Sequence, residues 1–167
     1  MNQQLTLATL QGIQFLRGVT REHLEQIAGI SEFCDYEPGE IVFRKGDLAE
    51  WMYLVVFGKL SIELCFNDSD CKQIVMVGPG ELLGWSSLLK QPQMAATARA
   101  VEPTRLVRMD SAKLLAFCDE DPAFGYEFMR RTTLALAKRL NATWEQLSHV
   151  HLVHYLPVSA AAAEIED

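Results

Sequence analysis

The sequence lacks the segments that would direct the chain to a membrane or through one. Its longest uncharged apolar runs, such as LVHYLPVSAAAA, contain polar residues and fall short of the ~18 residues that a membrane span needs. The weak apolar stretch in MNQQLTLATLQG has no basic segment before it, which argues against a secretory signal. We therefore expect a cytoplasmic chain with no membrane partner.

Positive charge is also scarce. The chain of 167 residues has 15 Lys and Arg against 22 Asp and Glu, a net charge of -7. The sequence offers Arg130 and Arg131 as a basic pair, but no overall field draws the chain onto nucleic acid. We expect no nucleic-acid partner.

Metal-binding and catalytic motifs are missing too. The cysteines show no CxxC pair and no Cys/His spacing of a zinc site, so we expect half-buried or buried thiols in a reducing compartment. Cys65 and Cys71 flank one predicted hairpin turn, which leaves a redox role open. His149, His151 and His154 are interpreted as exposed or interface side chains rather than metal ligands. No Ser/His/Asp or Cys/His arrangement has supporting motif context, so we expect neither a metal site nor an enzyme.

What the sequence does contain is a regular series of short apolar segments separated by turns. Apolar residues make up 49% of the chain, enough for one packed core. The turn sequences EPGE, KGD, FGK, NDSD, GPG and EPT separate segments that are typical of strands. A small, mainly β sandwich or barrel is therefore predicted. The predicted strands cover 33–36, 41–43, 52–56, 60–66, 74–77, 96–101 and 105–109.

Three helices are predicted around these strands. Thr20 and Asp110 are N-cap residue types, for helices that run to about Ile27 and Phe117. Pro122 is typical of the first turn of a longer helix that continues to about His151. At ~1.5 Å per residue that helix is roughly 45 Å long, more than so small a barrel can cover.

The apolar residues of the long helix divide into two stripes. Phe124 and Phe128 are expected to face the barrel. A second stripe, which starts at Tyr126, follows the alternating spacing of three and four that is typical of a coiled-coil seam. It predicts a homodimer, with a single amphipathic helix lying on its own domain as the alternative. The predicted interface residues are Met129, Thr133, Leu136, Leu140, Thr143, Leu147 and Val150.

The most informative stretch is GPGELLGWSSLLKQPQMAATARA, residues 78–100. A glycine turn opens a predicted short helix at Gly84, a polar loop follows, and a strand of small residues returns beside it. Unpaired N–H groups at a helix N-terminus favour an anion. Together with YEPGEIVFRKGD and YLVVFGKLSIEL, this outline resembles the phosphate-binding cassette and the recurring turns of cyclic-nucleotide-binding domains, as found in catabolite-activator-type regulators and kinase regulatory subunits.

The resemblance implies a double-stranded β-helix (jelly-roll) barrel followed by a long C-terminal helix. In that family a glutamate after the glycine holds the ribose, and an arginine that opens the returning strand neutralises the cyclic phosphate. This chain has Trp85 and Met94 at those positions. An indole cannot accept a hydrogen bond from a ribose hydroxyl, and a thioether gives a phosphate no counter-charge. Trp85 is expected either to fill the sugar site or to stack on an aromatic ligand.

The cassette therefore supplies a set of candidate ligand-binding residues without its usual charges. Gly84 fits an ordinary turn as well as close approach to an anion, and the serine hydroxyls fit backbone capping as well as ligand binding. Arg99 is expected to point away from Met94, and Lys90 into solvent. Loss of both charged contacts predicts cyclic-nucleotide binding that is ~10² to 10⁴ weaker, and no cofactor. The candidate residues are Gly84, Trp85, Ser86, Ser87, Met94, Ala95 and Ala96.

We expect residues 1–121 to form an N-terminal helix and the barrel, 122–155 a dimerisation helix, and 156–167 an acidic tail. Only 16 residues follow His151, too few for the DNA-binding domain that transcription factors of this family carry there. The leading hypothesis is a regulatory or sensor module with an altered ligand pocket and an unknown small-molecule or protein partner. The alternatives are a ligand-free dimeric interaction protein and a redox or haem sensor.

Overall fold

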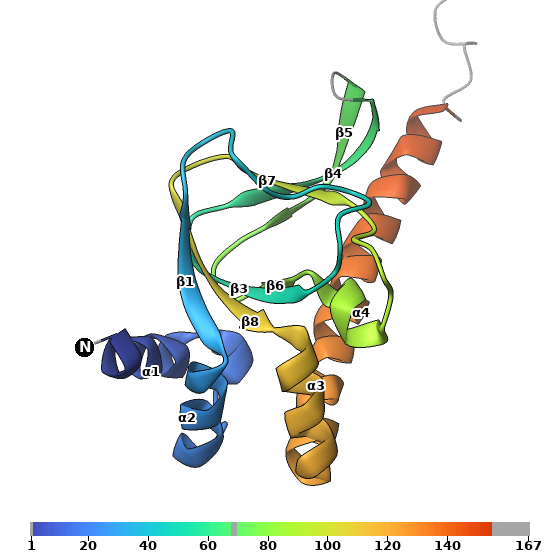
Figure 1. Cartoon of the computed structure of the whole chain (residues 1–167). Coiled ribbons are helices and arrows are strands. Elements are labelled where there is room, and N and C mark those ends of the chain that lie inside the picture. Colours follow the sequence, from blue (N-terminus) through green and yellow to red (C-terminus); the bar gives the residue numbers. More distant parts are fainter. Residues whose placement is uncertain (1, 68–69, 155–167) are drawn as a thin grey trace, which may run out of the picture.

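The protein is a small β-barrel with helices at one end and along one side (Figure 1). The computed structural model describes residues 2–67 and 70–154, so the predicted tail at 156–167 lies outside the described residues. The helices are α1 (Asn2–Gly12), η1 (Gln14–Leu16), α2 (Arg21–Gly29), η2 (Trp85–Leu89), α3 (Ser111–Glu120) and α4 (Pro122–His154). The strands are β1 (Ser31–Tyr36), β2 (Ile41–Phe43), β3 (Trp51–Phe57), β4 (Leu60–Asn67), β5 (Asp70–Val77), β6 (Leu82–Leu83), β7 (Thr97–Ala100) and β8 (Thr104–Asp110).

The strands form two antiparallel sheets that face each other across the barrel. The first has the order β1-β8-β3-β6 and the second the order β2-β7-β4-β5. This arrangement confirms the predicted jelly-roll, and each of the seven predicted segments overlaps a strand. Strand β6 was not predicted because two residues are too short to show an alternating pattern.

The first sheet is buried on both faces because β3 alternates between two cores. Tyr53 and Val55 point into the barrel, where they pack with Leu60, Leu83 and Leu106. Met52 and Leu54 point the other way, toward the helices. The helical core also contains Leu10, Ile13, Leu16, Leu24, Ile27, Leu114, Phe124 and Phe128.

The predicted helix starts are confirmed at atomic detail. The Thr20 hydroxyl accepts a hydrogen bond from the backbone N–H of His23, and the Asp110 carboxylate accepts one from Lys113. Helix α4 begins at Pro122, as predicted. Helix α1 was not predicted, yet its Leu10 is fully buried in the helical core.

Helix α4 has two differently placed halves. Its first turns pack beside α3 beneath the barrel, and the helix then runs along the side of the barrel past β5 (Figure 1). With 33 residues at ~1.5 Å each it is roughly 50 Å long. Within the described ranges, no helix combines the length and the apolar character that crossing a membrane requires.

Candidate functional site

The cassette turn is built around Gly84, which follows β6. Gly84 has a φ of 77°, a left-handed conformation that favours glycine. A Cβ atom at this position would lie 2.7 Å from the carbonyl oxygen of Trp51 and 3.0 Å from the ring of Tyr53. Packing against β3 is therefore a sufficient reason for the glycine, independent of any anion.

The helix after Gly84 is a 3-10 helix of five residues, too short for a strong helix dipole. The Ser87 hydroxyl donates to the carbonyl oxygen of Gly84 at 2.8 Å, and the Ser111 hydroxyl donates to Ser87 at 2.7 Å. Ser87 is thus used to hold the turn against α3. Of the two predicted serines, Ser86 is the one beside the cavity described below.

Met94 is buried and its backbone is held firmly. Its N–H donates to the Asp47 carbonyl oxygen at 2.8 Å, and its own carbonyl oxygen accepts from Gly46 at 2.9 Å. Its side chain is 3% exposed and packs in the barrel core. The side chain of Met94 therefore belongs to the hydrophobic interior of this chain.

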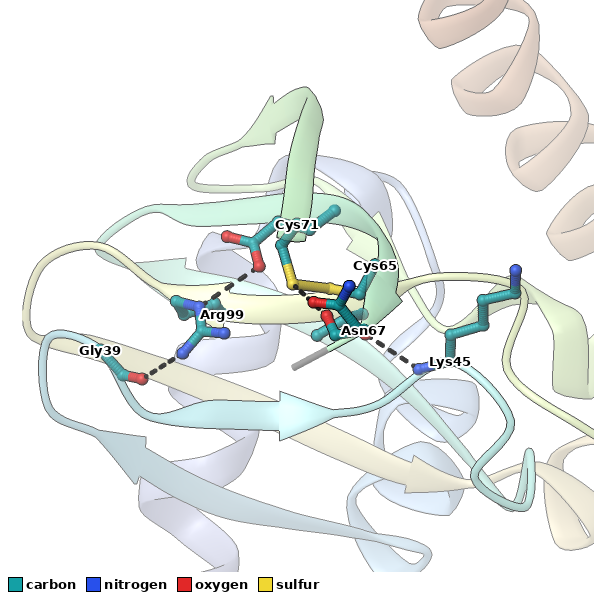
Figure 2. Close-up of a disulfide and its surroundings, with 8 residues drawn as sticks. Gly39, Lys45, Cys65, Asn67, Cys71 and Arg99 are labelled. Carbon is teal, nitrogen blue, oxygen red and sulfur yellow. Dashed lines mark hydrogen bonds and ion pairs between the residues drawn. A yellow bond between two sulfur atoms is a disulfide. The ribbon is translucent and has the colours of Figure 1, made fainter. Parts of the chain in front are cut away.

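The nearby cations of the cassette, Arg99 and Lys90, point elsewhere than to Met94. Arg99 forms an ion pair with Glu63 at 3.3 Å and donates to the Gly39 carbonyl oxygen at 3.0 Å (Figure 2). Arg99 lies on the face opposite Met94, as predicted, and Lys90 is exposed. Both cations are absent from the residues that line the cavity at Met94, within the part of the chain that the structure describes.

A cavity of about 170 Å³ lies between the cassette, the second sheet and α4. Trp85 is half-buried, packs partly on the helical core and also faces this cavity. The indole therefore leaves space rather than closing the site completely. Six of the seven candidate residues line the cavity: Gly84, Trp85, Ser86, Met94, Ala95 and Ala96.

Two further residues of the cavity come from α4: Arg139 was not among the predicted site residues, and Thr143 was predicted for the dimer seam. Arg139 and Thr143 line the cavity wall, and Arg139 donates to the carbonyl oxygen of Leu82 at 2.7 Å. The helical repeat places both residues on the same face of α4 as the buried Phe128, which could have indicated that they point toward the barrel. From the buried Phe128, steps of three and four residues lead through Thr132 to Arg139 and Thr143.

The exposed apolar residues Leu140, Trp144 and Leu147 form an outer stripe on α4, which differs in detail from the predicted seam. Leu140 and Leu147 are exposed, at 48% and 55%, whereas Met129 packs on the helical core and Thr143 lines the cavity. Trp144, which the predicted seam omits, is 58% exposed one turn after Leu140. Thr133 is also exposed and Leu136 is half-buried, and the side chain of Val150 lies outside the described residues.

The cysteine prediction was wrong for one pair. Cys65 and Cys71 face each other in the β4–β5 register and form a disulfide (Figure 2). Cys34 and Cys118 are free and half-buried, as expected. Burial raises the pKa of the Cys118 thiol to about 11, with Asp119 and Asp121 adding to the effect, so this thiol is a poor nucleophile.

Comparison with known proteins places this geometry in a family. The model of the cyclic nucleotide-binding domain matches residues 33–121. A crystal structure from Geobacter metallireducens, named for cyclic nucleotide binding, superposes with a TM-score of 0.71 and 29% identity, over 81% of this chain and 98% of the other. The cavity, the cassette and α4 thus lie in a fold shared with such proteins.

Two curated relatives match part of their own length. The cyclic AMP receptor protein of Thermus thermophilus is 28% identical over 78% of this chain and 59% of its own. A chain of Rhodopseudomonas palustris that is named a potassium channel protein is 37% identical over 63% of this chain and 25% of its own. The chain therefore spans between a quarter and about three fifths of these relatives. It belongs to the cyclic nucleotide-binding domain family, whose members include regulatory proteins of the receptor type.

Proposed function

We propose that the protein is a regulatory sensor module whose cavity takes a small ligand other than a cyclic nucleotide. The observation that carries the proposal is the placement of Trp85 and Met94 on the cavity wall. Cyclic AMP would meet an indole where it needs an acceptor and a thioether where it needs a cation. Losing two charged hydrogen-bonded contacts, at ~1.5–3 kcal/mol each, weakens binding by ~10² to 10⁴.

The size of the cavity supports the same proposal. Pockets for typical organic ligands measure roughly 300–1,000 Å³. The cavity here measures about 170 Å³ and is bordered by the bulky side chains of Phe43, Ile62 and Trp85. A nucleotide would need these side chains to move, whereas a smaller molecule would not.

Calorimetry with cyclic AMP and cyclic GMP tests the proposal directly. We expect no binding at micromolar concentration. The double variant Trp85→Glu with Met94→Arg is expected to gain measurable affinity for cyclic AMP. Met76→Arg, which adds a cation at a partly exposed position on β5, is the control and is expected to gain none. Micromolar binding by the unmodified protein would refute the proposal.

We further propose that the module is a homodimer joined along the second half of α4. Leu140, Trp144 and Leu147 expose large apolar side chains on that half of the helix. Apolar surface removed from water contributes roughly 25 cal/mol per Å², so a second copy of this stripe is a favourable partner. The ligand cavity lies on the other side of the same helix, which would connect ligand and assembly.

The disulfide supports a second candidate function, a response to redox conditions. Cys65 and Cys71 lie on β4 and β5, the strands that also supply Ile62, Ile74 and Val75 to the cavity wall. A dithiol reductant would deliver two electrons and two protons, converting the bridge into two thiols while becoming a disulfide itself. The hairpin would lose the covalent link between the two strands that supply part of the cavity wall.

Hydrogen exchange measures this response. Reduction is expected to speed amide exchange in β4 and β5, and Cys65→Ser with Cys71→Ser is expected to reproduce that change without reductant. Cys34→Ser is the control, because Cys34 lies outside the bridge. Equal exchange rates before and after reduction, with mass spectrometry confirming the free thiols, would exclude a redox role for the hairpin.

A further inference from the structure

Arg139 is the distinctive residue of the cavity wall. It lies on the face of α4 that points toward the barrel, and its guanidinium donates to the carbonyl oxygen of Leu82, the first residue of β6. The Thr143 hydroxyl donates to the Arg139 carbonyl oxygen one turn later, at 3.0 Å. The contact with Leu82 holds the guanidinium at the edge of the cavity, and the Thr143 contact is made by the Arg139 backbone.

Arg139 differs from three other arginines of the structure because it forms no ion pair with an acidic side chain among the described residues. Arg99 pairs with Glu63, Arg105 with Asp35, and Arg131 with Glu127. Among the side chains that the structure describes, no carboxylate forms such a pair with Arg139. Removal from water lowers the pKa of Arg139, and the more distant charge of Glu81 opposes that shift. An arginine stays protonated even so, and the site therefore holds a positive charge that no carboxylate contacts directly among the described residues.

Apart from Ser86 and Thr143, the other described side chains of the cavity wall are apolar. Among the described residues that line it, Arg139 is the one that carries a charge. Its walls include Phe43, Ile62, Ile74, Trp85 and Met94. An apolar cavity of about 150 Å³ is large enough to take a benzene ring, which is close to the volume found here. The cavity thus combines a space for a small apolar body with a single cationic edge.

We propose that the cavity binds a small organic monoanion, a carboxylate attached to an aromatic ring or a short aliphatic chain, with Arg139 as its counter-charge. This inference rests on the proposed function, since it names the ligand class of the same cavity. The planar fork of a guanidinium matches the two oxygens of a carboxylate, and the indole of Trp85 offers a face to an aromatic ring. One guanidinium neutralises one negative charge, which favours a carboxylate over a phosphate dianion.

The position of Arg139 on α4 gives ligand binding a mechanical consequence. A carboxylate held by Arg139, with its apolar body between Trp85 and the second sheet, links α4 to the barrel at a point one residue before the exposed Leu140. The ligand would therefore stabilise the second half of α4 in its present position. Binding is expected to slow amide exchange between residues 135 and 145.

Calorimetry with benzoate, phenylacetate and hexanoate tests the inference, with tryptophan fluorescence as a second readout. We expect saturable binding at millimolar concentration or below by at least one of the three. Benzamide and benzyl alcohol, which share the apolar body but carry no charge, are expected to bind at least ~10-fold more weakly. Equal binding of benzoate and benzamide, or binding by none of the three carboxylates, would overturn the inference.

Variants of α4 assign the charge to one residue. Arg139→Gln is expected to weaken carboxylate binding by ~10- to 150-fold, because a charged hydrogen-bonded contact is lost. Lys138→Gln removes the same charge from the neighbouring exposed position and is expected to change nothing. Arg139→Lys, which keeps the charge without the fork, is expected to give an intermediate affinity and serves if the glutamine variant does not fold. Unchanged affinity in both Arg139 variants would refute the assignment.

The two proposals fail in different ways. Micromolar binding of cyclic AMP would refute the proposed function, whatever the carboxylates do. If neither carboxylates nor cyclic nucleotides bind, the proposed loss of cyclic-nucleotide binding is supported. The inference that the ligand is a carboxylate is then refuted. That result would favour a protein that works through its α4 surface without a ligand.

Discussion

The two halves of α4 differ in how they pack against the rest of the protein. In the first half Phe124 and Phe128 are buried in the helical core, and Arg131 donates to the carbonyl oxygens of Phe15 and Arg17. In the second half the inward residue Arg139 borders a cavity, and the outward residue Leu140 is exposed. The first half fixes the helix to its own domain. The second half carries the groups that we propose to bind a ligand and a second copy of the chain.

Phe128→Ala tests the anchoring of the first half of α4, and it has the largest expected effect on the free energy of unfolding. Phe128 is 1% exposed and contacts the rings of Phe15 and Phe124 at centroid distances of 5.4 and 5.6 Å. Its truncation is expected to lower the free energy of unfolding by ~3–5 kcal/mol, measured by urea denaturation. Leu134→Ala, at a position that is 56% exposed, is the control and is expected to change it by less than ~0.5 kcal/mol. A similar loss in both variants would show that burial in the helical core does not set the contribution of an α4 side chain to stability.

Leu140→Glu tests the second half alone. In a dimer joined along the outer stripe, two carboxylates would be forced into an apolar interface, which costs ~3 kcal/mol or more and raises the dissociation constant over ~100-fold. Sedimentation is expected to show a dimer for the unmodified protein and a monomer for the variant, with the circular dichroism of the barrel retained. Asn141→Glu adds the same charge at the next exposed position and serves as the control. A monomeric unmodified protein at micromolar concentration would contradict the proposed dimer.

The contact between α3 and α4 gives a smaller effect, again confined to the first half. A Cβ atom at Gly125 would lie 2.6 Å from the Cys118 carbonyl oxygen, so an alanine must push the two helices apart. Overpacking costs ~1–3 kcal/mol and better helix propensity returns ~1 kcal/mol, which leaves Gly125→Ala destabilised by ~1 kcal/mol. Gly12→Ala, with no atom within 4 Å of the added carbon, is expected to be neutral or slightly stabilising. A stabilised Gly125→Ala protein would show that the helices can separate freely.

The fold could be predicted from sequence because its signals are local. Thr20, Asp110 and Pro122 mark helix starts by residue type, and turn sequences separate the strands. The missing cassette charges could also be predicted, because Trp85 and Met94 occupy aligned positions. What escaped prediction depends on contacts between distant segments. The pairing of Cys65 with Cys71 needs the hairpin register, and the role of Arg139 needs the position of α4 against β6.

The outer stripe of α4 illustrates the same limit. The prediction assumed an alternating spacing of three and four residues, which averages 3.5 residues per turn. An α-helix has 3.6 residues per turn, so residues chosen at that spacing gradually move around the helix surface. Met129 and Thr143 therefore face the protein itself, while Trp144 lies on the exposed face. The rotation of the helix, and with it the choice of residues that face solvent, is set by tertiary packing such as that of Phe124 and Phe128.

The smallest expected effect is a pH dependence that belongs to the first half of α4. Glu127 accepts hydrogen bonds from Arg130 and Arg131, each at 2.8 Å, and these contacts lower its pKa from 4.5 to about 2. A carboxyl whose pKa is lower in the folded state stabilises the protein above its unfolded pKa, and that contribution is lost as the pH falls through the folded pKa. The window is thus from about 4.5 down to about 2.

Urea denaturation across this window, at low ionic strength, measures the contribution. Glu127→Gln is expected to flatten the fall in stability with decreasing pH, since the glutamine does not titrate. The change is expected to be modest and to shrink in salt, because the side chain is 37% exposed and its ion pairs are screened. Glu25→Gln removes a carboxylate from the exposed pair with Arg21 on α2 and is expected to flatten the curve less. If the two variants gave the same curve, the Glu127 contacts would not distinguish the anchored half of α4 from any exposed helix.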